Sequence, residues 1–274
     1  MEAGPQHPIR VAVAGFGAVG RVVAQRLDDG IPGLALTAVS ARNVAQAQAR
    51  LAGFSAQIPV VPLERLAEHA DVVVECLPAA VFLQVAEPTL RAGRTLMAIS
   101  AGAILDYPEL RDLAAQHGGR IIVPTGALLG LDAVQAAAEG VIASVRMITR
   151  KPPRGLEGAP YLVERGITLN GLNAPKLLYT GPAREAVKGF PANVNVAAAL
   201  SLAGIGPDRT TVEIWADPAL DRNTHTITVE SDSAQLTLTI ANIPSEENPR
   251  TGKITALSVI AALRKLAAPL TIGT

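Results

Sequence analysis

The chain has 274 residues, enough for one or two domains, and its 24 basic and 24 acidic side chains give a formal charge of zero. A neutral chain has no basic face to release counterions from nucleic acid, and aromatic residues, at 3%, are too few for base stacking. No apolar run is long enough to span a bilayer, no signal peptide opens the chain, and the single cysteine suits a reducing compartment. We therefore expect a soluble, cytoplasmic protein without nucleic-acid or membrane partners.

From Ile9 to about Pro124, short runs of strand-forming residues alternate with helical stretches. The predicted strands are IRVAVAG (9–15), LALTAVS (34–40), ADVVVEC (70–76), RTLMAIS (94–100) and RIIVP (120–124). Near-continuous apolar strands spaced by helices are typical of a parallel sheet covered on both faces. The pattern predicts an α/β fold with a doubly wound parallel sheet.

After Pro124 the pattern changes. A helix candidate, LDAVQAAAEG (131–140), leads into the strand VIASVRMITRKPP (141–153), and three later runs alternate with period two: RTTVEIWAD (209–217), THTITVESD (224–232) and AQLTLTIANI (234–243). Strands with short connections favour a mostly antiparallel sheet that is polar on one face. Within the segment GFPANVNVAAALSLAGIG (189–206), a helix is predicted that begins at Asn193 or a neighbour and ends at Gly204 or Gly206. A last helix, within 252–274, is expected to pack back on the first domain.

The segment VAVAGFGAVGRVV places Gly15, Gly17 and Gly20 in the pattern G-x-G-x-x-G, directly after a strand and at the start of a helix. Such glycines allow a tight turn, close approach of the backbone to a pyrophosphate, and close packing of helix on strand. In this context the pattern predicts a Rossmann-type dinucleotide site, with a purely structural turn as the alternative. The intervening Phe16, Ala18 and Val19 are expected to contact the cofactor too.

The end of the second strand bears on the choice between NAD and NADP. An NAD-specific protein usually has Asp or Glu about 20 residues beyond the glycines, to bind the ribose 2′-hydroxyl. The segment TAVSARN has no acid and offers Ser40 and Arg42 instead. Arginine accepts a 2′-phosphate, so NADP use or tolerance of both cofactors is one interpretation, and a solvated arginine at a helix start is the other.

Loops rich in small residues follow three further strands, where ligands lie in doubly wound sheets. The segments are ECLPAAV (75–81), SAGAI (100–104) and PTGALLGLD (124–132). The residues expected to contact the cofactor there are Cys76, Leu77, Pro78, Ser100 and Ala101. No histidine is near Cys76 in sequence, so Cys76 is expected to be a small packing residue rather than a nucleophile.

Candidate substrate residues lie in the second half. The segment ITRKPP sets Thr149, Arg150 and Lys151 at a strand end, where cations would neutralise a dicarboxylate or merely face solvent. The segment FPANVNVAAAL places Asn193 and Asn195 at a helix start, where one can act as N-cap while the other offers its amide to the nicotinamide or the substrate.

His225 is one of four histidines and opens the strand that begins at THTITVE. On composition alone, a partly exposed histidine among threonines is more often structural than catalytic. With a nicotinamide site argued separately, the chemistry needs a group that titrates near neutral pH, and His225 supplies one with an unperturbed pKa. We predict that His225 is catalytic, with Asn223 and Thr224 beside the substrate.

Taken together and in order, several segments resemble the L-aspartate dehydrogenase family over nearly the whole chain. They are VAVAGFGAVG, ECLPAAV, PTGALLGLDAV, TRKPP, FPANVNVAAALSLAGIG, DRNTH and SEENPRTGKITALSVIAAL. The resemblance implies NAD- or NADP-dependent oxidation of L-aspartate to iminoaspartate, which hydrolyses to oxaloacetate and ammonia, and the reverse reductive amination, which can feed NAD biosynthesis. It also implies that His225 is the active-site residue, that Ala127 and Asn195, in preference to Asn193, contact the nicotinamide, and that a homodimer forms through the second domain.

The expected organisation is a dinucleotide-binding domain at 1–124 and a substrate, catalytic and dimerisation domain of α+β type at 125–251. The expected partners are small molecules, and no metal is expected. Two alternatives to an aspartate dehydrogenase stay open: a nicotinamide-dependent reductase or dehydrogenase of another small carboxylate, and a non-catalytic NAD(P)-sensing protein. A sensor would not need His225 with Asn223 and Thr224.

Overall fold

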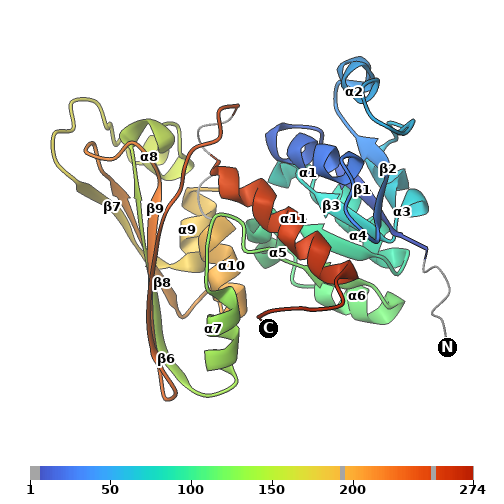
Figure 1. The fold of residues 1–274 in the computed structure, drawn as a ribbon. Helices are drawn as coiled ribbons and strands as arrows, with labels where there is room; N and C mark the ends of the chain where they lie inside the picture. The colour runs from blue at the N-terminus through green and yellow to red at the C-terminus, as the bar shows by residue number, and fades with distance from the viewer. Residues whose placement is uncertain (1–6, 192–194, 248–250, 274) are drawn as a thin grey trace. The chain divides into compact units, whose positions relative to one another are not determined.

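The structure is a computed structural model that describes residues 7–191, 195–247 and 251–273. The chain divides into two compact units. The N-terminal unit ends at Pro124 and takes in a returning segment, Ala256–Ile272, while the C-terminal unit includes Thr125–Thr255 (Figure 1). No helix in the described ranges is long and apolar enough to cross a membrane.

The N-terminal unit contains a five-stranded sheet of order β2-β1-β3-β4-β5 in which every neighbouring pair is parallel. The strands are β1 (Ile9–Ala14), β2 (Leu34–Ser40), β3 (Val72–Glu75), β4 (Thr95–Ala98) and β5 (Arg120–Ile122). The helices are α1 (Ala18–Asp28), α2 (Val44–Leu51), α3 (Leu66–His69), α4 (Leu83–Arg91), α5 (Ala101–Asp106), α6 (Leu110–His117) and α11 (Lys253–Ala267). The predicted doubly wound parallel sheet is confirmed.

One bridge beyond β2 relates this sheet to the Rossmann arrangement. Val39 of β2 forms a parallel bridge with Val60, at the position where a third Rossmann strand would stand. The sheet is therefore a Rossmann sheet in which that strand is reduced to a single bridge. The chain order reverses between β1 and β3, and ligands bind outside the carboxyl ends of the strands at such a point.

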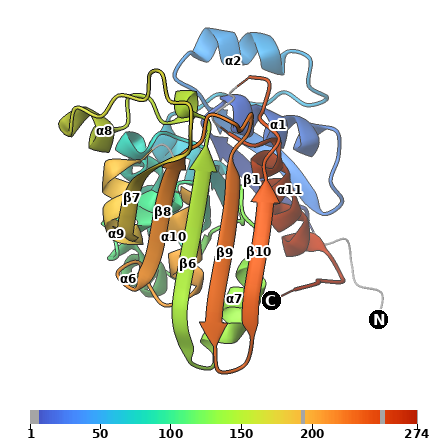
Figure 2. The ribbon, with the colours of Figure 1, turned by 90° about the vertical axis from the view of Figure 1, so that its left-hand side faces the viewer.

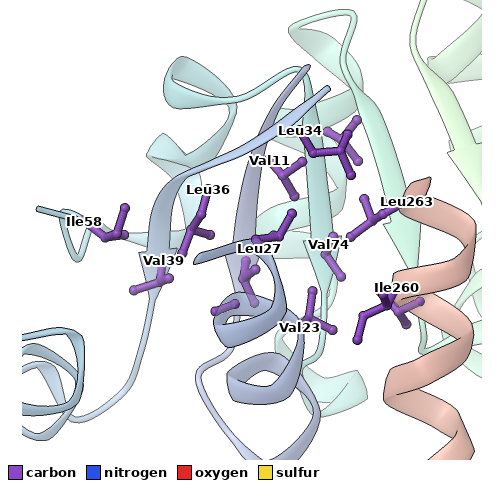
Figure 3. Close-up of a cluster of buried hydrophobic side chains, with 14 of the residues drawn as sticks. Val11, Val23, Leu27, Leu34, Leu36, Val39, Ile58, Val74, Ile260 and Leu263 are labelled. Atoms are coloured by element: carbon purple, nitrogen blue, oxygen red, sulfur yellow. The ribbon is translucent and has the colours of Figure 1, made fainter. Parts of the chain in front are cut away.

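The core of the N-terminal unit includes the returning helix. Val11 of β1, Val23 of α1 and Val74 of β3 pack in one cluster with Ile260 and Leu263 of α11, and each is at most 5% exposed (Figure 3). Every residue of β3 is buried, as expected of a strand covered on both faces. A buried aliphatic side chain contributes about 1.5–3 kcal/mol relative to an exposed one, so α11 is a substantial part of this core.

The C-terminal unit is built on a second sheet, of order β10-β9-β6-β8-β7 (Figure 2). Its strands are β6 (Ile142–Lys151), β7 (Lys176–Pro182), β8 (Thr210–Ala216), β9 (Thr224–Ser231) and β10 (Gln235–Ala241). Its helices are α7 (Leu131–Ala138), α8 (Pro160–Glu164), α9 (Ala183–Gly189) and α10 (Asn195–Ala203). Only the β6·β8 pair is parallel among these neighbours, which confirms the prediction of a mostly antiparallel sheet.

Successive side chains of a strand point to opposite faces, and this sorts the residues of β6. Beyond the register shift between Ile142 and Ser144, the buried residues are Val145, Met147, Thr149 and Lys151. A Cβ atom added to Gly204, just after α10, would lie 3.3 Å from Val134 of α7 and 3.5 Å from Val145 of β6. Helices α7 and α10 therefore cover this face, and Arg146 points to the other, exposed face.

Candidate functional site

The glycine loop between β1 and α1 requires glycine at two positions for steric reasons. Gly15 has φ +96°, and a Cβ atom there would lie 2.6 Å from the Cys76 carbonyl oxygen. A Cβ atom at Gly20 would lie 1.9 Å from the Gly15 carbonyl oxygen, so the helix could not pack against the loop. Gly17 is different because it is exposed and no described atom lies within 4 Å of an added Cβ. A ligand has room to approach the backbone there.

The start of α1 fits a pyrophosphate. Gly17 is the N-cap and provides no side-chain cap, and the first turn has no acidic residue within the described chain. The partly exposed Ala18 and Val19 therefore present backbone N–H groups at the positive end of the helix dipole, which favours an anion. Phe16, 9% exposed, anchors the loop in the core.

The end of β2 borders this loop. The backbone N–H of Gly15 donates to the carbonyl oxygen of Ser40 at 3.0 Å, so Ser40 holds the loop through its main chain. Arg42 is exposed and makes no ion pair with any residue that the structure describes. Asn43 caps α2 by accepting a hydrogen bond from the N–H of Gln46, at 3.0 Å. Arg42 is thus not needed for the helix start and is available to a 2′-phosphate or to solvent.

A buried acid that sequence reasoning missed lies at the end of β3. Glu75 is fully buried, and its Oε1 accepts hydrogen bonds from the N–H of Leu77 at 2.7 Å and from the hydroxyl of Ser100 at 2.9 Å. Its Oε2 accepts a hydrogen bond from the N–H of Ser100 at 2.9 Å. Burial raises the pKa of Glu75, and these hydrogen bonds act in the opposite direction. The signal in the sequence was an acid that ends the apolar run VVVE.

The other residues predicted for these two loops differ in exposure. Cys76 is half-buried, its N–H donates to the carbonyl oxygen of Ala14 at 2.8 Å, and burial together with the charge of Glu75 raises its pKa well above the ordinary value. The thiol form therefore dominates, which suits a packing residue. Pro78 is exposed, whereas Ala101 is buried as the first residue of α5.

In the C-terminal unit, the register of β6 and β9 places Thr149 opposite His225. The Thr149 hydroxyl oxygen lies 3.1 Å from Nδ1 of His225, and both residues are at most 2% exposed. This contact occupies Nδ1, and Nε2 is left without a hydrogen-bond partner among the described residues. The arrangement fixes the ring and leaves one nitrogen for chemistry.

The expectation of a partly exposed His225 with an unperturbed pKa was wrong. Burial, and then the positive charge of Lys151, lower the pKa of His225 from 6.5 to about 3. Sequence could not reveal this, because burial depends on the helices that cover the face and the charge comes from a neighbouring strand. The imidazole is neutral throughout the physiological pH range.

The two predicted cations, Arg150 and Lys151, lie on opposite faces of β6. Lys151 is 4% exposed and shares the buried face with Thr149 and His225. Arg150 points to the opposite face, where its guanidinium lies 3.4 Å from the Asp217 carboxylate and 5.1 Å from the centre of the Trp215 ring. The structure therefore brings Lys151, but not Arg150, to the face of His225.

A second residue that sequence reasoning missed is Asn242, which is 4% exposed. Its side-chain Nδ2 donates to the carbonyl oxygen of Ala127 at 3.0 Å, and its backbone N–H donates to the carbonyl oxygen of Asn223 at 2.8 Å. Asn242 thus ties the turn that contains Ala127 to the segment just before His225. Thr224 pairs with Arg150 in register and so lies on the opposite pleat from His225.

Of the two candidate asparagines, Asn195 is the exposed first residue of α10. Asn193 lies outside the described residues. The helix ends at Ala203, so Gly204 follows it, as one of the two predicted endings requires. Within the ranges that the structure describes, no cluster of His, Cys, Asp and Glu could hold a metal ion.

A Rossmann sheet with a glycine loop suited to a dinucleotide, together with a second unit that holds a buried histidine, is what we expect of a nicotinamide-dependent oxidoreductase. Family comparisons agree with this class. Residues 15–124 match the model described as "Homoserine dehydrogenase, NAD binding domain", and residues 132–266 match the one described as "Aspartate dehydrogenase, C-terminal".

Curated relatives narrow the class to one family. The chain is 57% identical to L-aspartate dehydrogenase 3 of Bordetella bronchiseptica over 98% of this chain and 99% of that protein. It is 55% identical to L-aspartate dehydrogenase of Bradyrhizobium diazoefficiens, over 97% and 94%. The chain belongs to the L-aspartate dehydrogenase family, as the sequence predicted. The crystal structure of aspartate dehydrogenase from Thermotoga maritima shares the fold, with a TM-score of 0.72 at 22% identity over 97% of this chain and 100% of that one.

Proposed function

We propose that this protein catalyses the NAD- or NADP-dependent oxidation of L-aspartate to iminoaspartate, which hydrolyses to oxaloacetate and ammonia, and the reverse reductive amination. The observation that carries the proposal is the 57% identity, over nearly the full length, to a relative named as L-aspartate dehydrogenase. The buried pair of Thr149 and His225, with Lys151 on the same face, supports it.

Each unit would contribute its own part. The backbone of the glycine loop and the start of α1 would bind the pyrophosphate, and the loops with Cys76, Leu77, Pro78, Ser100 and Ala101 would line the cofactor. Bound nicotinamide would supply the hydride acceptor for the amino-acid Cα. From the C-terminal unit, Ala127 and Asn195 or Asn193 would contact the nicotinamide, and Lys151 would attract a substrate carboxylate, since opposite charges attract strongly where water is excluded.

His225 would move the proton. The amino group of the substrate must be neutral before hydride can leave the adjacent carbon, and Nε2 of the neutral imidazole would accept that proton or activate the water that attacks the imine. Two substrate carboxylates would offset the charge of Lys151, which is one cause of the low pKa of His225. Substrate binding would thereby raise the proton affinity of the ring when it is needed. Thr149 would hold Nδ1 and so keep the ring in one orientation.

An assay of the purified full chain tests this function. Oxaloacetate with ammonia should consume NADH or NADPH, and L-aspartate should reduce the oxidised cofactors. A panel of other amino acids and oxo acids separates aspartate from other small carboxylates. Tight cofactor binding without turnover of any of these acids would instead favour a non-catalytic NAD(P)-sensing protein. Faster turnover of another acid would favour a dehydrogenase or reductase of that small carboxylate.

We also propose a homodimer formed largely through the C-terminal unit, in the cytoplasm. The exposed face of the second sheet supports the dimer, because it mixes Arg146, Trp215 and paired threonines such as Thr226 and Thr239 in a surface that the helices of this unit leave uncovered. Size-exclusion chromatography with light scattering measures the molar mass and so tests the dimer. A monomer at micromolar concentration would contradict the proposal. Cell fractionation tests the location.

A further inference from the structure

We propose that Glu75 is a positioning residue of the cofactor site: its buried carboxylate ties together the loops after β3 and β4 and sets the shape of the nicotinamide half. The inference rests on the proposed function, which puts the cofactor at the carboxyl ends of these strands. It concerns a residue that does not itself need to touch the cofactor.

The position of Glu75 in the sheet is central. It is paired in register with Ala14 at the end of β1 and with Ala98 at the end of β4. Its two carboxylate oxygens then serve different loops: Oε1 accepts from the N–H of Leu77 at 2.7 Å, and Oε2 accepts from the N–H of Ser100 at 2.9 Å. One rigid side chain therefore fixes the backbone of both loops relative to each other.

The same network reaches the glycine loop. The N–H of Cys76 donates to the carbonyl oxygen of Ala14, and the Cys76 carbonyl oxygen packs so closely on Gly15 that a Cβ atom there would lie 2.6 Å away. The segment from Glu75 to Leu77 is thus in direct contact with the first glycine of the loop. In the described part of the chain, the N–H groups of Ala18 and Val19 at the start of α1 make no hydrogen bond with this segment. We therefore expect displacement of the segment to affect the nicotinamide half of the cofactor site more than the pyrophosphate half.

Burial of a carboxylate at this place in the core is unfavourable unless hydrogen bonds compensate for the lost hydration. The preceding strand residues, Val72 to Val74, are buried and apolar. A fourth apolar residue would suit the buried position in the strand equally well. All three groups around Glu75 are donors, namely two backbone N–H groups and the Ser100 hydroxyl, which lies 3.1 Å from the Leu77 carbonyl oxygen as well. Each carboxylate oxygen accepts from one backbone N–H group, which an apolar side chain could not do, so the acid matches the loops rather than the sheet.

Glu75→Gln is the decisive variant, because it keeps the size of the side chain and replaces one acceptor by a donor that faces a backbone N–H. The matched control is Thr89→Val. Thr89 is 1% exposed in the same unit, and its hydroxyl donates to the Val85 carbonyl oxygen within α4 at 2.6 Å, away from both loops. Ser100→Ala is a milder second variant, since it removes the hydroxyl and keeps the N–H bond to Glu75.

The measurement is binding of NADH and of ADP-ribose to the full chain, by fluorescence and by calorimetry, with urea unfolding in parallel. ADP-ribose shares the adenine and pyrophosphate half but lacks the nicotinamide. We expect Glu75→Gln to weaken NADH binding by about tenfold, the scale of one charge-assisted hydrogen bond, while ADP-ribose binding stays unchanged. Ser100→Ala should move the ratio of the two dissociation constants in the same direction by about threefold, and Thr89→Val should leave it unchanged even though it lowers stability.

Two results would overturn the role of Glu75 while leaving the proposed function intact. One is an unaltered ratio of dissociation constants in Glu75→Gln, and in Ser100→Ala if the first variant does not fold. The other is an equal loss of both ligands, which indicates a purely structural effect. A wild-type protein that binds neither ligand would instead refute the proposed function and this inference with it.

Discussion

At the scale of single residues, His225 shows how the fold changes chemistry that composition suggests. A free imidazole titrates near neutral pH, but burial and Lys151 lower the pKa of this one to about 3. The ring is therefore a neutral acceptor whose proton affinity depends on what binds beside it. The residue type could be predicted to matter, and its charge state could not.

Removal of this ring should reveal its role in proton transfer. We expect His225→Ala to lower kcat by about 10²-fold or more, the usual effect of losing a general acid–base group, while the dissociation constant for NADH stays nearly the same. Thr149→Val should have a smaller effect in the same direction, because it removes only the partner of Nδ1. Steady-state rates and cofactor titration measure both. An unchanged kcat in His225→Ala would rule out this assignment.

The low pKa of His225 has a consequence for stability. The unfolded chain titrates at about 6.5, so between pH 6.5 and 3 it binds one proton more than the native state does at this residue. The free energy of unfolding should therefore fall as the pH falls through that window, by at most about 1.4 kcal/mol per pH unit from this group. Urea unfolding of the wild type and of His225→Gln at several pH values measures the difference. Equal slopes in the two proteins would contradict the prediction.

Arg42 should decide how well NADPH is used. The guanidinium is exposed and makes no ion pair with a described residue, so it is free to bind a 2′-phosphate in the two-pronged manner of arginine. We expect Arg42→Ala to lower kcat/KM for NADPH by about tenfold and to leave NADH unaffected. Arg50→Ala, on the following helix, is the control. A strong preference for NADH that Arg42→Ala does not alter would make Arg42 a solvated residue only.

At the scale of elements, the strands with strong apolar or alternating patterns were predictable. LALTAVS coincides with β2, and the predicted period-two runs contain β8, β9 and β10. Strand β7 and helices α3, α8 and α9 were not predicted, and most of the predicted loop at 100–104 belongs to helix α5 (Ala101–Asp106). The β7 segment contains Gly181 and Pro182 and lies at a sheet edge, and its place depends on Tyr179, which packs on Tyr161 and Phe190 from elsewhere in the chain.

The residues of the candidate site also differ in how well the sequence predicts them. The glycine loop was predictable because its meaning lies within a few neighbouring residues. Glu75 and Asn242 were missed because each has a partner far along the chain: the Ser100 N–H is 25 residues from Glu75, and the Ala127 carbonyl oxygen is 115 residues from Asn242. Such bonds have no local pattern.

Asn242 should hold the Ala127 turn in place. Asn242→Ala removes the donor to the Ala127 carbonyl oxygen, and we expect a loss of about 1–3 kcal/mol in the free energy of unfolding together with weaker NADH binding. Thr239→Ala, at an exposed position of β10 shortly before Asn242, should change stability by less than about 0.5 kcal/mol. Urea unfolding and cofactor titration measure both variants. A result for Asn242→Ala that matches the control would show that the tie is dispensable.

At the scale of the whole molecule, α11 makes the N-terminal unit discontinuous in sequence. Leu263 is fully buried in the cluster that includes Val11 and Val74. We expect Leu263→Ala to lower the free energy of unfolding by about 2–5 kcal/mol, the usual range for a leucine removed from a core. The exposed Leu257, on the same helix, is the control. Urea unfolding decides, and equal effects of the two substitutions would mean that α11 is not an integral part of the core.

The late position of α11 also sets an order for events on the ribosome. The sheet strands of the N-terminal unit are synthesised first, yet the helix that completes their core is synthesised only after the strands of the C-terminal unit. At a translation rate of 5–20 residues per second, the delay is on the order of ten seconds. During that time the nascent sheet exposes apolar surface that α11 later covers. A chaperone that binds this surface would therefore protect the nascent chain from aggregation most effectively in this interval.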